Sequence, residues 1–171
     1  MAAPPAPDTR WSFCLDPGLI RDIAMKWFRR APATDPADER QPMQRIKQVI
    51  LIRKDLTMRR GKEIAQGSHA AMEFIIDPIR LRLSASSLRI DLNAIEKAWI
   101  TRGMAKVCLR VNSEEELLSY HEKALELGLK SYLIRDSGRT EFGGQPTYTS
   151  CAIGPDEIDR IDAVTGDLVP Y

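Results

Sequence analysis

The stretch that most constrains the fold is residues 46–53, with the sequence IKQVILIR. Its apolar residues are mostly β-branched and nearly continuous, a pattern typical of a strand covered on both faces of its sheet. Similar patterns predict further strands at 105–111, 130–135 and 147–154, and helices at 61–76, at 93–100 within an insertion, at 113–128 and, opened by Pro155, at 155–166. Strands that alternate with helices indicate an α/β domain. Because the last strand need not run parallel to the others, we expect a mixed sheet.

Composition limits the classes of function. With 43% hydrophobic and 29% charged residues, the chain is expected to fold around an ordinary soluble core. Its net charge of +1 gives no overall attraction to nucleic acid, so any such attraction must come from clustered charge. No apolar run approaches the roughly 20 residues that a membrane-spanning helix needs. The first ten residues lack the charged head and apolar middle of a signal peptide, so we expect a cytoplasmic protein.

The three cysteines are Cys14, Cys108 and Cys151. Their odd number and wide spacing argue against a disulfide framework and against a paired-cysteine zinc site. A reducing compartment is the simplest interpretation. Cys108 and Cys151 fall in predicted strands, where we expect both to pack in the core.

Residues 1–43 differ from the rest of the chain. A Pro- and Ala-rich start is followed by a possible amphipathic helix at 16–30, and a proline-containing linker follows at 31–42. The basic and aromatic end of that helix could touch a membrane surface or RNA, or the helix could pack on its own domain or on a partner. We therefore expect an N-terminal extension over 1–43 and a folded domain over 44–171.

The predicted helix at 61–76 has two distinct faces. Its apolar side carries Ile64, Ala71 and Ile75, and its polar side carries Lys62, Gln66, His69 and Glu73. We expect the apolar side to face the core. Arg59 and Arg60 precede the helix, and cations at a helix N-terminus suit a bound phosphate or carboxylate. Taken alone, the polar side is more typical of a solvated surface than of a binding site, and a single histidine such as His69 is more often structural than catalytic.

A glycine-rich loop follows the third predicted strand and contains Asp136, Arg139 and Thr140, and Thr149 follows in the next strand. In α/β sheets, sites form at the carboxyl ends of parallel strands. We therefore expect this loop and the start of the 61–76 helix to open on the same edge of the sheet. A lysine that meets Asp136 there would lower the pKa of its carboxyl. The alternative is that Asp136 only caps the loop or forms a plain salt bridge.

Three blocks carry a resemblance to a known family. They are KDLTMRRGKEIAQGSHAA at 54–71, SYLIRDSGRTE at 131–141 and TYTSCAIGP at 147–155. In this order they resemble the signature blocks of the second, archaeal and eukaryotic, type of peptidyl-tRNA hydrolase. The resemblance spans about residue 46 to Tyr171. Departures from the family pattern include Ile64 in place of a usual alanine and Glu141 in place of a common Gln or Lys.

The resemblance implies a three-layer α/β/α fold with a mixed four-stranded sheet, and often a homodimer. It implies hydrolysis of the ester that joins a peptide to the terminal ribose of tRNA, without a metal or organic cofactor. By matching position it implies site residues Lys62, Gln66, His69, Asp136, Thr140 and Thr149. Two alternatives stay open: a non-catalytic module that binds RNA or protein, and a hydrolase of another acyl ester.

Within this hypothesis, Asp136 orients or deprotonates water, and Lys62 stabilises the oxyanion, although the two could exchange roles. Thr140 and Thr149 fix the water or the ester, while Gln66 and His69 hold the peptide or the terminal nucleotide. The tRNA phosphates are expected to contact a set of cations on both sides of the site. These cations are Arg53, Lys54, Arg59, Arg60, Arg135 and Arg139.

Overall fold

The computed structural model describes residues 45–84 and 90–171. The predicted N-terminal helix and linker lie outside these residues. The described strands are β1 (Ile46–Arg53), β2 (Lys106–Val111), β3 (Ser131–Asp136) and β4 (Thr147–Glu157). The helices are α2 (Arg60–Arg80), α3 (Ala94–Thr101), α4 (Glu114–Glu126) and α5 (Ile158–Thr165). None of these helices is long and apolar enough to cross a membrane.

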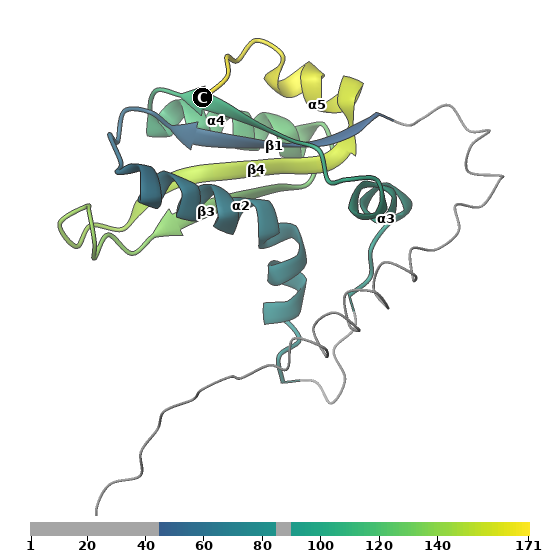
Figure 1. Ribbon diagram of the computed structural model, residues 1–171, viewed down its shortest axis with the longest axis horizontal. Helices are drawn as coiled ribbons and strands as arrows, with labels where there is room; N and C mark the ends of the chain where they lie inside the picture. Colours follow the sequence, from purple (N-terminus) through teal and green to yellow (C-terminus); the bar gives the residue numbers. More distant parts are fainter. Residues whose placement is uncertain (1–44, 85–89) are drawn as a thin grey trace, which may run out of the picture. The chain divides into compact units, whose positions relative to one another are not determined.

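The four strands form one mixed sheet in the order β2-β1-β4-β3. β1 pairs parallel with β2, while β4 runs antiparallel to both β1 and β3. Helices α4 and α5 cover one face of the sheet, and α2 and α3 cover the other (Figure 1). The predicted three-layer α/β/α fold with a mixed four-stranded sheet is therefore confirmed.

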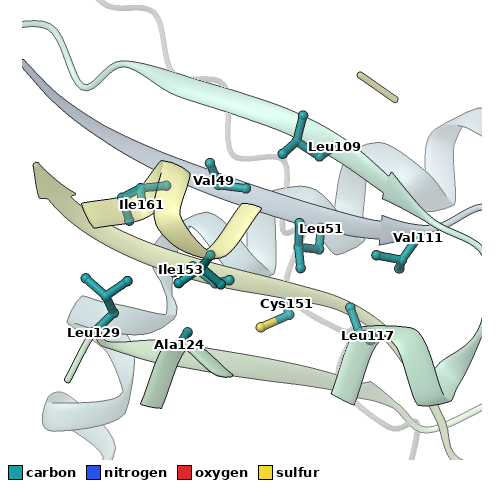
Figure 2. Close-up of a cluster of buried hydrophobic side chains, with 11 residues drawn as sticks. Val49, Leu51, Leu109, Val111, Leu117, Ala124, Leu129, Cys151, Ile153 and Ile161 are labelled. Atoms are coloured by element: carbon teal, nitrogen blue, oxygen red, sulfur yellow. The ribbon is translucent and has the colours of Figure 1, made fainter. Parts of the chain in front are cut away.

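The larger core lies between the sheet and helices α4 and α5 (Figure 2). Val49 and Leu51 of β1 and Ile153 of β4 are fully buried there, against Leu117 of α4 and Ile161 of α5. Their neighbours Ile50 and Ile52 face the opposite way, toward α2. Side chains of a strand alternate between the two faces of its sheet. The nearly continuous apolar run of β1 therefore reflects the fact that both faces are covered.

A smaller cluster fixes α2 and α3 against the start of β1. Phe74 of α2 and Trp99 of α3 are buried with Ile46, and their rings meet edge to face with centroids 5.6 Å apart. The Trp99 indole N–H donates to the Ala105 carbonyl at 2.9 Å, which satisfies its polar group. This cluster anchors the middle of α2, so the first turns of the helix are held over the opposite end of the sheet.

Three sequence predictions need correction. The last helix begins at Ile158, not at Pro155, because β4 continues through Pro155 to Glu157. Cys151 is buried as expected, but Cys108 is exposed because β2 is an edge strand with only part of its length covered. Ile64 is 64% exposed, and the buried residues of α2 are Gln66, Ala70 and Phe74. The face of α2 that meets the sheet is therefore the face that carries Gln66.

Candidate active site

Three segments meet at one end of the sheet. β1 and β3 both end there and β4 begins there, because β4 runs antiparallel to each of them. The loop at 137–146 that joins β3 to β4 lies beside the start of α2 (Figure 1). The expected convergence of the loop and the helix at the carboxyl ends of β1 and β3 is therefore present.

The centre of this region is an ion pair between Lys62 and Asp136, which are far apart in the sequence. The Lys62 ammonium donates to Asp136 Oδ2 and, at 3.2 Å, to Thr140 Oγ1. The two charged side chains are 14% and 13% exposed, so most of the pair is buried but one side remains open. The Lys62 ammonium also lies 5.8 Å from the centre of the Phe142 ring, which covers it from the loop.

Gln66 links this pair to β4. Its side-chain N–H donates to Asp136 Oδ2 at 2.9 Å, while its Oε1 accepts from the Thr149 hydroxyl at 2.6 Å. Both ends of the amide are therefore occupied, and the residue is only 3% exposed. A buried amide with both ends satisfied holds its partners in fixed positions.

Thr149 reaches Gln66 because β4 is irregular at this point. Ile134 of β3 pairs with Ser150, but the next residue, Arg135, pairs with Tyr148, so Thr149 is left without a partner on β3. Such a bulge re-aims side chains that would otherwise alternate. Thr149 and Ser150 both turn toward α2, where the Ser150 hydroxyl donates to the backbone carbonyl of Gln66 at 3.2 Å.

The turn after β3 holds the second oxygen of Asp136. The Gly138 N–H donates to Asp136 Oδ1 at 2.9 Å. Gly138 has φ +78°, and a Cβ placed on it would lie 2.2 Å from the Gln145 carbonyl oxygen. Only glycine fits this position, which closes the loop and fixes the carboxylate.

The surroundings of Asp136 act on its pKa in opposite directions. Burial raises the pKa of this carboxyl, but the Lys62 hydrogen bond, the Gly138 N–H, the Lys62 charge and the Gln66 amide together lower it below its ordinary value of 3.8. Asp136 is therefore a carboxylate at neutral pH.

Two clefts flank the ion pair. The first, of about 370 Å³, runs between α2 and β3 and is lined by Gln66, His69, Glu73, Arg80 and residues 133–137. The second, of about 430 Å³, lies between the 56–59 turn and the loop, where Thr140, Glu141 and Phe142 line it. Asp136 borders the first cleft and Thr140 the second.

The predicted phosphate-binding cations separate into two groups. Arg60 and Arg139 are exposed, and they make no ion pair with any other residue in the described part of the chain. Arg59 is 80% exposed at its side chain although it pairs with Glu141 at 2.6 Å, and the ammonium of Lys54 stacks 4.8 Å from the Tyr171 ring centre.

Arg53 and Arg135 lie in different surroundings. Arg53 is 8% exposed and bonds to Asp55, Glu114 and the Tyr148 carbonyl. It therefore holds the carboxyl end of β1 in place, and the prediction that it contacts phosphate is wrong. The Arg135 guanidinium stacks 5.5 Å from the Tyr148 ring centre, and Arg135 borders the first cleft.

With this geometry in place, the chain can be compared with known families. Residues 46–171 match the model of the family "Peptidyl-tRNA hydrolase PTH2". This chain belongs to the PTH2 family. The three blocks noted in its sequence all fall within the matched residues, and each contributes a side chain to the cluster around Asp136.

Curated relatives resemble this PTH2 chain over the same domain. The peptidyl-tRNA hydrolase of Methanocaldococcus jannaschii is 40% identical over 124 residues, which are 72% of this chain and 97% of that protein. The peptidyl-tRNA hydrolase of Methanopyrus kandleri is 42% identical over 123 residues, which are 71% and 95% of the two chains. A probable peptidyl-tRNA hydrolase 2 of Dictyostelium discoideum is 40% identical over 125 residues, 73% of this chain and 54% of that one.

Two contributors to the candidate site were missed from the sequence. Ser150 fixes the backbone of α2 at Gln66, and Phe142 covers the Lys62 ammonium. An aromatic residue in a glycine-rich loop was a signal for Phe142, whereas the role of Ser150 depends on the bulge. Among residues 45–84 and 90–171, no group of three or more His, Cys, Asp or Glu side chains could hold a metal ion. Independence of metals and the homodimer both stay predictions.

Proposed function

We propose that this protein hydrolyses the ester bond of peptidyl-tRNA, releasing the peptide and the tRNA. Membership of the PTH2 family supports the reaction class. The observation that carries the proposal for the site is the hydrogen-bonded cluster of Lys62, Gln66, Asp136 and Thr149. The cluster is rigid on its buried side and has unused hydrogen-bonding capacity on its open side, where a substrate would enter.

In this proposal Asp136 orients the attacking water. A carboxylate offers about four acceptor positions. Oδ2 accepts from Lys62 and Gln66, and Oδ1 accepts from Gly138, so one position on Oδ1 is left for water. Because its pKa is lowered, Asp136 is a weak base, and its role is to align the water and pass a proton on. The water oxygen bonds to the carbonyl carbon, and the proton reaches the ribose oxygen as the ester C–O bond breaks.

Lys62 stabilises the charge that develops on the carbonyl oxygen. An ammonium has three N–H donors. Two of them point to Asp136 and Thr140, and the third is available on the open side of the pair. A donor held in place before the reaction stabilises an oxyanion most strongly in a site from which water is largely excluded.

Gln66 and Thr149 act in this proposal as positioning residues, because each is buried and each holds a neighbour in the cluster. This departs from the expectation that Gln66 holds peptide or nucleotide directly. Thr140 positions Lys62 and borders the second cleft, and His69, which is exposed beside the first cleft, contacts the substrate.

The tRNA binds in this proposal beside the start of α2. Among the described residues, no side-chain hydrogen bond caps this helix N-terminus, so its first backbone N–H groups and its positive dipole are available to a phosphate. Arg59 and Arg60 lie at this end of α2, and Arg139 precedes Thr140, which bonds to Lys62. Lys54 contacts Tyr171, whose hydroxyl donates to Glu63 in the first turn of α2. Contacts to phosphate carry little sequence information, which suits an enzyme that acts on many tRNAs.

The test is cleavage of a purified N-acetyl-aminoacyl-tRNA by the full chain. Asp136→Asn keeps the shape of the side chain but removes its charge, and should lower kcat/KM by about a hundredfold. The matched control is Asp159→Asn, at an exposed aspartate of α5, which should stay within about twofold of the native chain. Tight binding of the substrate without cleavage by the native chain would instead favour a non-catalytic RNA-binding module.

We also propose that residues 1–43 form an extension that the reaction does not require, and that the segment binds a partner. The match to the family model begins only at residue 46, which supports a boundary near Gln44. A chain that begins at Gln44 should retain kcat/KM within about threefold, because the hydrogen-bonded cluster lies entirely within the matched residues. A loss larger than this would place part of the catalytic machinery in the extension.

A further inference from the structure

The wall of the first cleft is unusual in that five consecutive residues, 133–137, all line it. Strand side chains alternate between the two faces of a sheet. Leu133 packs toward α4 and Ile134 packs toward α2, as the alternation requires. Residues whose side chains point to opposite faces of the sheet can line the same cleft only where the exposed edge of the strand, with its main chain, forms the wall of that cleft.

β3 is the outer strand of the sheet on this side. In an antiparallel pair, every second residue turns its N–H and C=O away from the partner strand. Gly154 donates to the Lys130 carbonyl, so the residues of β3 that bond to β4 are the even-numbered ones. The main-chain groups of Leu133 and Arg135 therefore point outward into the cleft, and they make no backbone hydrogen bond with other described residues outside the strand pairing.

We propose that this edge binds the peptide part of the substrate as an extended strand added to β3. The inference rests on the proposed function. The cleft is continuous with the site, since Gln66 and Asp136 line its inner end. A peptide whose ester carbonyl lies at Asp136 and whose earlier residues pass Leu133 runs parallel to β3. Helix α2 forms the opposite wall, with His69 and Glu73 over the bound strand.

Main-chain recognition explains how one cleft accepts different peptides. Strand addition takes its affinity from backbone hydrogen bonds, which every amino acid except proline provides. The second cleft lies beside Arg59 at the uncapped start of α2, so it suits the phosphates of the tRNA end. In this proposal the peptide binds in the first cleft and the tRNA end in the second, and the ester that joins them lies at the ion pair.

The length of the cleft limits the number of residues that bind. Gln66 and Glu73 are separated by about 10 Å along α2, at 1.5 Å per residue. This corresponds to about three residues of extended chain. At the far end Glu73 is paired with Arg80, which closes the lined region.

The first experiment uses the native full chain and defined substrates. KM is measured for N-acetyl-aminoacyl-tRNA and for tRNAs that carry two, three, four and five residues. KM should fall by about three- to tenfold in total and stop falling after about three residues, as expected for one or two net hydrogen bonds. In the tripeptidyl substrate, N-methylation of one amide should raise KM by a similar factor and N-methylation of the neighbouring amide should not, because alternate residues face β3.

A matched pair of variants links this effect to β3. Arg135→Pro removes an outward N–H, and proline is tolerated at an edge strand where no ladder hydrogen bond is lost. Arg135→Ala removes the same guanidinium and keeps the N–H. In Arg135→Ala, KM should be lower for the tripeptidyl substrate than for the N-acetyl-aminoacyl substrate. In Arg135→Pro, KM for the tripeptidyl substrate should be about three- to tenfold higher than in Arg135→Ala, so that the two substrates have similar KM values.

The outcomes separate this inference from the proposed function. Cleavage of every substrate with the same KM, or equal sensitivity to N-methylation at neighbouring amides, overturns strand addition and leaves the hydrolase intact. No cleavage of any substrate by the native chain overturns both. If Arg135→Pro unfolds, as judged by its circular dichroism, the N-methyl series on the native chain still decides.

Discussion

Two of the lysine–carboxylate pairs in the described part of this domain differ in the hydrogen-bonding capacity that remains on their carboxylates. In the first, Lys62 meets Asp136 at the mouth of a cleft. In the second, Lys130 meets Glu96, whose side chain is 1% exposed. The Glu96 carboxylate also accepts the Asn93 N–H at 2.8 Å and thereby closes the capping box that begins α3.

The difference shows how similar charges serve two purposes. Glu96 is sealed at the start of a helix, where its partners are the backbone and a lysine, so it stabilises the position of α3. Asp136 is held by three donors but borders a cleft and keeps one acceptor position toward it. A charged pair becomes a candidate for catalysis when buried hydrogen-bond partners fix its geometry and one side of the pair remains open to a cleft.

The largest expected effect comes from removing the lysine of each pair: one substitution should mainly lower kcat/KM, and the other should mainly lower stability. Lys62→Ala should lower kcat/KM by about a hundredfold through the lost oxyanion donor, with about 1 kcal/mol or less of stability lost. Lys130→Ala should leave kcat/KM within about twofold and cost about 2 kcal/mol, because Glu96 loses its cation. Cleavage assays and urea unfolding measure the two quantities.

If Lys130→Ala reduced turnover as strongly as Lys62→Ala, the distinction between the two pairs would be lost. Lys97→Ala, at an exposed lysine of α3, controls for the removal of any cation from this part of the surface.

A smaller effect is expected from Thr149, which contacts the Asp136 pair only through Gln66. Thr149→Val removes the hydroxyl that bonds to Gln66 and should lower kcat by about tenfold with little change in KM, because Gln66 then loses its orientation. Thr149→Ser retains the hydroxyl and should recover kcat to within about threefold of the native value. A merely structural role would lower the melting temperature of both variants without a selective loss of kcat.

The exposed cations around the Asp136 pair should contribute less individually. KM for peptidyl-tRNA should rise with salt, and Arg60→Ala or Arg139→Ala should each lower the slope of log KM against log salt concentration by about 1. Arg53→Ala should instead lower stability, because Arg53 is buried against Asp55 and Glu114. A native KM that does not change with salt would contradict an electrostatic tRNA surface.

The smallest expected effect is on pH dependence. Because the pKa of Asp136 is lowered, the stability that its pairing provides is present above the ordinary value of 3.8 and is lost as pH falls through the lower folded value. The acid limb of kcat/KM that Asp136 causes should therefore lie below pH 3.8 in the native chain. In Lys62→Ala this limb should move to higher pH, since the main lowering partner is gone. An unchanged limb would indicate that another group controls it.

Much of the fold could be predicted from local sequence patterns. β1 was predicted with the observed bounds, and the helix predicted at 113–128 is α4, whose N-cap Ser113 accepts the Glu116 N–H at 3.1 Å. Errors occurred where tertiary contacts override local preference. Pro155 resembles a helix start, yet it lies in β4, which is irregular where it pairs with β1.

For the candidate site, the convergence of the loop and the helix could be predicted, but the orientation of individual side chains could not. The blocks identified Lys62 and Asp136, but the helical pattern assigned Gln66 to the polar side and Ile64 to the core. The structure reverses this because the amide of Gln66 has two polar partners below α2, and no such partner is visible in the sequence of the helix itself. Arg53 likewise became structural through neighbours that are distant in sequence, such as Glu114.

Thr149, the residue of β4 that has no partner on β3, contributes a hydroxyl to the cluster but is not needed for strand pairing. The sheet could therefore persist after the cluster had lost this hydroxyl. A chain shortened by one residue at Thr149 could still align Tyr148 and Ser150 with β3 in a regular ladder, and its core would survive. It would then have no hydroxyl beneath the Gln66 amide. Loss of function in a relative of this protein could therefore begin with the deletion of a single codon, long before any charged side chain of the cluster is replaced.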